Sequence, residues 1–173
     1  MIEDDWGSKG ISLRKIAVLA RDRAAFDELC RGFLITHGAT PHPAHAPMRT
    51  RDGNGGAGET TGEVIITAFP IRRRPNNELP FVSVGRIDGN DIALADETVS
   101  KFHAFIKETP AGFLVQDARS RNGTTVEGQV VPQRGAGPPT KLVSGHNVRF
   151  GSVTTTFLDA GALSDLARQL YGS

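Results

Sequence analysis

Cysteine, excess charge and long apolar runs are what this 173-residue sequence lacks. Its one cysteine, Cys30, excludes an internal disulfide and suits a reducing compartment. The net charge of +1 gives no field for a nucleic acid or a membrane surface, and no apolar run approaches the roughly 20 residues of a membrane span. The acidic residues Glu3, Asp4 and Asp5 are unlike the start of a signal peptide. These absences predict a soluble cytoplasmic protein without a nucleic-acid or membrane partner.

Glycine and proline are plentiful, with 20 and 10 residues, and they separate many short apolar runs. Short runs bounded by turn-forming residues are typical of strands in an all-β sandwich. The spacing of these runs predicts about ten or eleven strands. They include Glu63–Pro70 as the first strand, a hairpin of Ala104–Lys107 and Phe113–Asp117, and Val153–Leu158 near the end.

The N-terminal region differs, because Leu13–Ile35 is its most helix-like segment. Apolar residues at i, i+3, i+4 and i+7 spacing are Phe26, Leu29, Cys30 and Phe33. Asp22 suits an N-cap, and Gly32 or Gly38 suits a stop. A strand over Ile16–Ala20 that leads into a helix at Asp22 is the alternative. Such a helix either packs on the main domain or docks a partner.

Composition also predicts how the chain is divided. His37–Gly62 is rich in His, Pro, Gly and Thr, which is typical of a linker. Ala162–Tyr171 has an amphipathic pattern that predicts a helix capping the sheet. We therefore expect an N-terminal extension of helix and flexible linker at residues 1–62, the sandwich at 63–159 and a short C-terminal helix at 160–173.

Three segments in the first half of the chain have the composition of possible ligand sites. The spacing of one set, which is Cys30, His37, His42 and His45, matches no common zinc site. Gly53–Gly58 fits G-x-G-x-x-G, but a dinucleotide site needs a strand before it and a helix after it. We therefore expect no metal and no cofactor. Arg72–Arg74 is either a solvated loop or a patch for a phosphate or an acidic partner.

Five polar residues between positions 86 and 122 fall in predicted loops or at strand ends, where binding groups usually lie. They suit a phosphate, which carries close to two negative charges and three acceptor oxygens. Arg86 has a planar fork of donors, Ser100 a hydroxyl and Lys101 a flexible charge. Asn122 has both donors and an acceptor, so it can bind a ligand's main chain. Arg121 precedes it.

The order Gly85-Arg86, Ser100-Lys101-Phe102-His103 and Asn122-Gly123-Thr124 resembles the forkhead-associated (FHA) domain, a β-sandwich that reads phosphothreonine, as in small bacterial FHA proteins. The resemblance implies that Arg86, Ser100 and Asn122 contact the phosphopeptide and that Lys101 contacts the phosphate. It also implies that Gly85, His103 and Gly123 are architectural, with His103 holding the Ser100 turn. Where the family often has Ser or Thr, Arg121 either adds a charge contact or crowds the threonine methyl pocket.

The resemblance implies an adaptor in Ser/Thr kinase signalling whose partner is a phosphothreonine-containing protein, either a kinase or its substrate. The alternative is a scaffold of the same fold that binds its partner without phosphate. Catalysis by Ser100 and His103 is not expected, because the sequence shows neither a nucleophile elbow nor a third member. Self-association is a further expectation. It would use a phosphorylated threonine of the N-terminal part, and the candidates are Thr40, Thr50, Thr60 and Thr61.

Overall fold

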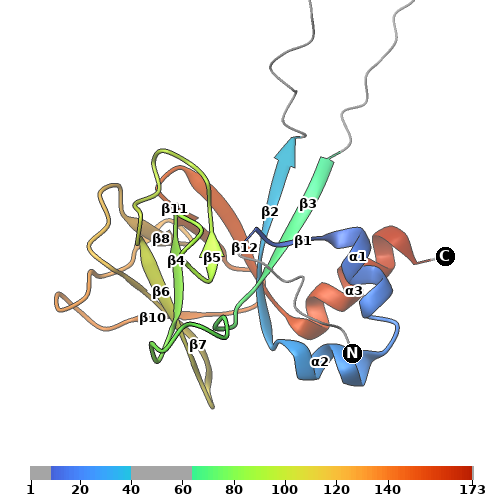
Figure 1. The fold of residues 1–173 in the computed structure, drawn as a ribbon. Helices are drawn as coiled ribbons and strands as arrows, with labels where there is room; N and C mark the ends of the chain where they lie inside the picture. The colour runs from blue at the N-terminus through green and yellow to red at the C-terminus, as the bar shows by residue number, and fades with distance from the viewer. Residues whose placement is uncertain (1–8, 40–63, 173) are drawn as a thin grey trace, which may run out of the picture.

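The computed structural model describes residues 9–39 and 64–172, which form a β-sandwich with three helices on one side (Figure 1). The seven-stranded sheet has the order β1-β3-β2-β12-β11-β8-β9, and the five-stranded sheet has the order β10-β7-β6-β4-β5. The elements are β1 (Ile11–Ser12), α1 (Leu13–Leu19), α2 (Arg23–Leu29), β2 (Gly32–Ala39), β3 (Val64–Pro70), β4 (Val82–Gly85), β5 (Ile92–Ala93), β6 (Ala104–Thr109), β7 (Gly112–Asp117), β8 (Thr124–Val126), β9 (Gln129–Val130), β10 (Thr140–Leu142), β11 (Asn147–Phe150), β12 (Val153–Asp159) and α3 (Ala160–Tyr171).

The main core lies between the two sheets, because alternate side chains of each strand point inward. In β7, for example, Phe113, Val115 and Asp117 are buried while their neighbours are partly exposed. Phe113 meets Phe157 of the opposite sheet edge-on, with ring centroids 5.5 Å apart. Burial of this apolar surface, at roughly 25 cal/mol per Å², provides most of the stabilisation of the sandwich.

A second core lies between the helices and the outer face of β2, β3 and β12. Strand β2 serves both cores, because Phe33 and Ile35 face the helices while Leu34 faces the sandwich. Phe33 stacks on Phe26 of α2 at 5.6 Å between centroids, and Leu163 of α3 is buried in the same cluster. The helices therefore keep the outer face of β2, β3 and β12 away from solvent (Figure 1).

The helix-like segment Leu13–Ile35 holds two short helices, α1 and α2, and its last residues belong to strand β2. Helix α2 begins after Asp22, whose carboxylate accepts from the amide of Ala25 at 3.2 Å, so the predicted N-cap is confirmed. Residues 16–19 are helical, not a strand, and Gly32 and Gly38 lie in β2 instead of ending a helix. Phe33 fits the helical spacing that begins at Phe26, although it lies in β2. Both residues are apolar because α2 and β2 each contribute to the second core.

The expected division into an extension at 1–62 and a sandwich at 63–159 differs from the structure, because part of the expected extension belongs to the sandwich. Strand β2 pairs antiparallel with both β3 and β12, so it lies inside the seven-stranded sheet. Glu63–Pro70 is consequently not the first strand. The C-terminal helix is present and begins one residue after its N-cap Asp159, which accepts from the Ala162 amide at 2.8 Å.

Several predictions fall outside the described residues. They are the glycine-rich stretch Gly53–Gly58, the histidines His42 and His45, and the threonines Thr40, Thr50, Thr60 and Thr61. Within residues 9–39 and 64–172, no helix is both long and apolar enough to span a membrane.

Candidate functional site

A hollow of about 380 Å³ lies where the loops after β4, before β6 and after β7 meet. Four of the five residues that the sequence predicts for ligand binding line it, namely Arg86, Ser100, Lys101 and Arg121. Asn122 lies beside it and donates from Nδ2 to the carbonyl oxygen of Thr98, another lining residue, at 2.7 Å. The structure therefore brings together residues that are up to 36 positions apart in the sequence.

Arg86 is placed by the close approach of two backbone segments at the end of β4. Its amide donates to the carbonyl of Ser100 at 2.9 Å. Immediately before it, a Cβ on Gly85 would overlap the carbonyl oxygen of Lys101 and lie 2.6 Å from Asn90 Nδ2. Asn90 in turn donates to that carbonyl at 2.7 Å. Only glycine leaves room for this contact, so the residue before Arg86 sets how closely the two segments approach.

The buried carboxylate of Asp91 anchors the loop that carries Arg86. It accepts from the amide and hydroxyl of Ser83 at 2.7 and 2.9 Å and from Asn77 Nδ2 at 2.5 Å. It also accepts from the amide of Arg74 at 2.6 Å, and the Arg74 guanidinium donates to the carbonyl of Asp88 at 2.7 Å. A buried charge with this many donors is satisfied and holds its loop in one conformation.

His103 lies beneath the loops with no exposed surface. Its Nδ1 accepts from the Ser100 amide at 3.0 Å, so the ring proton lies on Nε2, which donates to the carbonyl of Gly123 at 3.0 Å. Burial lowers the pKa of this imidazole below its ordinary value of 6.5, although the carbonyl of Gly123 and the charge of Asp117 act in the opposite direction. The neutral ring thus holds the Ser100 turn.

The backbone amide of Arg121 orients the hydroxyl of Ser100. Its Oγ accepts from the amide of Arg121 at 3.0 Å. With one lone pair occupied in this way, the hydroxyl proton is free to donate toward a ligand. Ser100 is partly exposed, so a ligand in the hollow can reach it.

The buried carboxylate of Asp117 organises the third loop. It accepts from the amide of Ser120 at 2.8 Å, the hydroxyl of Ser120 at 2.6 Å and the hydroxyl of Thr124 at 2.7 Å. The Ser120 hydroxyl then accepts from the amide of Gly123 at 2.9 Å. Arg121 and Asn122 are held at the exposed tip of this loop, between the two anchoring residues.

The hollow is electropositive. Arg86, Lys101 and Arg121 line it, and the acidic lining residue is Glu97. In the described part of the chain, none of these three cations has a hydrogen-bond or ion-pair partner for its side chain. Unpaired cations beside a hydroxyl donor suit a multiply charged oxyanion, because each can form a charge-assisted hydrogen bond to it.

The same contacts argue against a Ser100–His103 nucleophile and base. Both ring nitrogens of His103 bond to backbone groups, and the serine hydroxyl bonds to the amide of Arg121. The imidazole is therefore not placed to accept the hydroxyl proton, which a general base must do.

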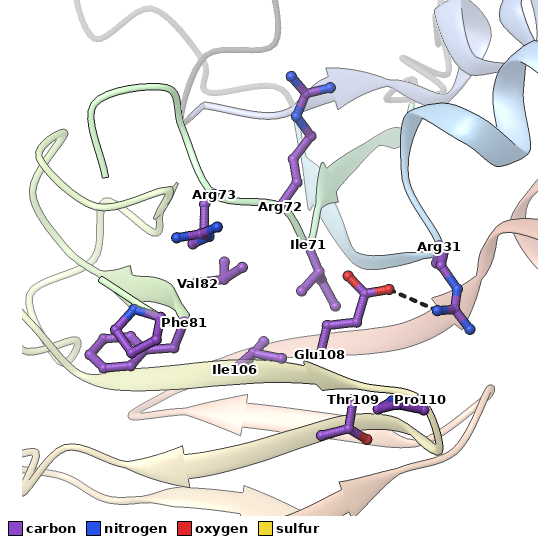
Figure 2. Close-up of a pocket in the computed structure, with 11 residues that line it drawn as sticks. Arg31, Ile71, Arg72, Arg73, Phe81, Val82, Ile106, Glu108, Thr109 and Pro110 are labelled. Carbon is purple, nitrogen blue, oxygen red and sulfur yellow. Dashed lines mark ion pairs between the residues drawn. The ribbon is translucent and has the colours of Figure 1, made fainter. Parts of the chain in front are cut away.

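A larger hollow of about 710 Å³ lies at the opposite end of β4 (Figure 2). Ile71, Val82 and Ile106 line its apolar part, and Arg31 at one end pairs with Glu108 at 3.2 Å. Arg73 donates to the carbonyl of Leu79 at 2.8 Å. The larger hollow therefore has cations that are partly engaged within the protein, whereas those of the smaller hollow have no side-chain partner among the described residues.

The three arginines of Arg72–Arg74 have different contacts in the structure. Arg74 anchors the loop of Arg86 through Asp88, and Arg73 ties down the segment that precedes β4. Arg72 extends away from the apolar floor of the larger hollow (Figure 2). None of the three lines the smaller hollow.

Cys30, whose spacing to His37, His42 and His45 matches no common zinc site, is a buried thiol. Its Sγ lies 2.9 Å from the carbonyl oxygen of Gly32 and 3.6 Å from that of Ile71, and the single thiol proton can be donated to either. Burial raises the pKa of the thiol to about 11, so it stays protonated at neutral pH.

The family of the sandwich follows from comparison with known proteins. The sequence model of the FHA domain family matches residues 82–151, which hold the hollow and all three of its loops. Residues 82–151 are an FHA domain.

Known proteins similar to this chain include FHA proteins of bacteria. The ABC transporter ATP-binding/permease protein Rv1747 of Mycobacterium tuberculosis is 32% identical over 126 residues, which are 70% of this chain and 13% of that protein. The solved FHA-2 domain of Rv1747 is 27% identical with a TM-score of 0.41, covering 71% of this chain and 93% of that one. The FHA domain of CT664 from Chlamydia trachomatis is 21% identical with a TM-score of 0.48, covering 74% and 97%.

The chain spans only a small part of its larger relatives. Besides Rv1747, a structure of EmbR from Mycobacterium tuberculosis in complex with a low-affinity phosphopeptide is 20% identical with a TM-score of 0.46. The match covers 75% of this chain and 24% of EmbR.

Sequence reasoning missed the residues that support the site from below. The sequence analysis assigns no supporting role to Asp91, Asp117 or Arg74, yet each of them anchors a loop of the hollow. One available pattern was an aspartate at a strand end followed by hydroxyl residues, as in Asp117, Ser120 and Thr124.

Proposed function

We propose that the FHA domain binds phosphothreonine in proteins and acts as an adaptor in Ser/Thr kinase signalling. Membership of the family supports this, because FHA domains are phosphopeptide-binding modules. The observation that carries the proposal is the convergence of the Ser100 hydroxyl and the unpaired side chains of Arg86 and Lys101 on one hollow. We therefore assign the chain as a binding module and not an enzyme.

The phosphate would occupy the hollow of Arg86, Ser100 and Lys101, and Asn122 would bind the main chain of the peptide. Asn122 suits this role because one amide N–H is used within the protein, while its other N–H and its Oδ1 remain for a ligand. Arg121 would face the phosphate or an acidic neighbour of the phosphothreonine. The partner would be a Ser/Thr kinase or one of its substrates. We place the protein in the cytoplasm, where the thiol of Cys30 stays reduced.

A pull-down from a degenerate phosphothreonine peptide library tests the proposal. The same library treated with phosphatase is the control for phosphate dependence. We expect enrichment only from the phosphorylated library and none with Arg86→Ala. Equal capture from both libraries would contradict the proposal.

Phosphate-independent binding is the second candidate, and an aromatic cluster on the five-stranded sheet favours it. Phe81, Phe102 and Phe105 have ring centroids 4.6 to 6.5 Å apart, and Phe102 is 40% exposed. Exposed aromatic clusters are frequent in protein interfaces. Capture of unphosphorylated peptides that persists in Arg86→Ala and is lost in Phe102→Ser would favour this candidate.

A further inference from the structure

A second electropositive hollow lies beside the first one. It has a volume of about 420 Å³, and its lining residues are Phe102, Ala118, Arg119, Arg134 and Gly135. Phe102 also lines the hollow of Arg86. One aromatic side chain therefore separates the two hollows, and a single peptide can lie across both.

The two arginines of this second hollow come from separate loops that are joined at their bases. Arg119 follows β7, and Arg134 precedes β10. The amide of Arg134 donates to the carbonyl of Asp117 at 2.8 Å, and Asp117 forms a parallel bridge with Gln133. These backbone contacts hold the two loops together. The side chains of Arg119 and Arg134 therefore line the same hollow.

Among residues 9–39 and 64–172, no acidic residue lines the second hollow. In the described part of the chain, neither guanidinium has a hydrogen-bond or ion-pair partner. The larger hollow of Figure 2 differs, because Glu108 lines it and pairs with Arg31. Two unpaired arginines that face the same space repel each other until an anion lies between them.

Arg119 also has a strained backbone. Its φ of 65° lies in the left-handed region that favours glycine. The only other described non-glycine residue with positive φ is Glu127, in the two-residue turn between β8 and β9. Strained residues of this kind concentrate at functional sites. Here the strain places a long cationic side chain where glycine would fit more easily.

We propose that the Arg119–Arg134 hollow binds a second anionic side chain of the same phosphopeptide. This inference rests on the proposed phosphothreonine binding and names its ligand class more narrowly: peptides in which an acidic or a second phosphorylated residue lies close to the phosphothreonine. Arginine suits both anions, because its planar fork donates to a carboxylate or to a phosphate in bidentate fashion.

Calorimetric titration with designed peptides tests the inference. The parent is an alanine-rich peptide with one phosphothreonine, and each derivative places either glutamate or phosphoserine at one successive position on either side. We expect a gain in affinity of about fivefold or more, confined to a few positions on one side. A larger gain from phosphoserine than from glutamate would identify a phosphate as the preferred anion. Equal gains from glutamate and phosphoserine would show that a carboxylate is enough to occupy the hollow.

Matched variants assign any gain to this hollow. Arg119→Gln with Arg134→Gln should reduce the gain to less than about twofold and leave the affinity of the singly phosphorylated parent within about threefold. Arg149→Gln, at an exposed position of β11 that lines neither hollow, removes one positive charge and should preserve the gain. Arg119→Gly should raise the midpoint of thermal unfolding by relieving the strained φ, while reducing the gain.

The outcomes separate this inference from the function it rests on. A parent peptide that fails to bind would contradict phosphothreonine recognition itself. A parent that binds, with no gain at any position, would overturn the second anion site and leave the proposed function standing. A gain that survives the double variant would also overturn it, because the added charge would then act elsewhere.

Discussion

The Nε2 atom of His103 lies 3.0 Å from the carbonyl oxygen of Gly123, on the opposite side of the ring from the Ser100 amide. One buried side chain thus joins the loop of Ser100 to the loop of Arg121 and Asn122. The carbonyl of Gly123 also accepts from the amide of Gly151 at 3.0 Å, so it keeps a partner without the imidazole, but the Ser100 amide does not. The position of Ser100 therefore depends on a neutral His103.

Acid should destabilise the protein through His103. Burial lowers the pKa of the folded imidazole below the ordinary 6.5, so the unfolded chain binds more protons between the two pKa values. The contribution of His103 to the free energy of unfolding is therefore fully present above about pH 6.5 and is lost as pH falls through the folded pKa. Urea unfolding from pH 8 to pH 5, with NMR titration of the ring, measures it. An imidazole that titrates at or above 6.5 would contradict this account.

His103→Ala should mainly lower the free energy of unfolding, because His103 supports the loops and does not itself line the hollow. The substitution leaves the Ser100 amide unpaired and opens a cavity, at a combined cost of about 2–5 kcal/mol. Denaturant unfolding gives the free energy directly, and the matched control is His146→Ala. His146 is partly exposed, and its Nδ1 accepts from the Val143 amide at 3.2 Å, away from the hollow. Equal losses from both substitutions would show that His103 has no special role.

Gly85→Ala should destabilise the loops around the hollow. The added Cβ would overlap the carbonyl oxygen of Lys101, so β4 and the loop before β6 would have to separate, at a cost of about 1–3 kcal/mol. Gly89→Ala is the control, because its nearest heavy atom would lie 4.0 Å away and its φ is not positive. Thermal unfolding of the two variants compares them. A Gly85→Ala protein as stable as Gly89→Ala would show that the segments move apart at little cost.

Much of the fold and the site could be predicted from the order of short motifs. Gly85-Arg86, Ser100-Lys101 and Asn122 are local sequences that end strands or begin loops, and four of the five predicted binding residues line one hollow. The hairpin at Pro110-Ala111 could be predicted for the same reason, since its turn chemistry is local.

The N-terminal region could not be predicted in this way, because its structure depends on distant partners. Strand β2 pairs with β12, more than 100 positions later, and buries side chains on both faces. A short strand buried on both faces lacks the alternation that distinguishes a strand from a helix. The supporting roles of Asp91 and Arg74 were hidden for the same reason, because each bonds to groups brought near only by the fold.

Phosphothreonine should be preferred over phosphoserine in the same peptide. A buried methyl group is worth about 0.8 kcal/mol by transfer, and a shaped pocket discriminates by about 1–3 kcal/mol. We expect a preference of about fivefold or more, measured by calorimetry with paired peptides. Arg121 is exposed and lines the hollow of Arg86, Ser100 and Lys101. If its long side chain crowds the methyl pocket, Arg121→Thr should increase the ratio of the affinities for phosphothreonine and phosphoserine. Equal affinities for the two peptides would show that the protein recognises phosphate alone.

The affinity of Arg86→Ala for a phosphothreonine peptide selected from the library tests the central claim most directly. Arg86 is partly exposed and its side chain has no partner among the described residues, so its removal should leave the free energy of unfolding almost unchanged. Loss of one partner of a charged pair with the bound phosphate costs about 2–5 kcal/mol, which is a fall in affinity of about 30-fold or more. Calorimetry should show that fall in a variant that unfolds like the wild type. Undiminished affinity would contradict the account, because the phosphate would then bind outside the hollow of Arg86, Ser100 and Lys101.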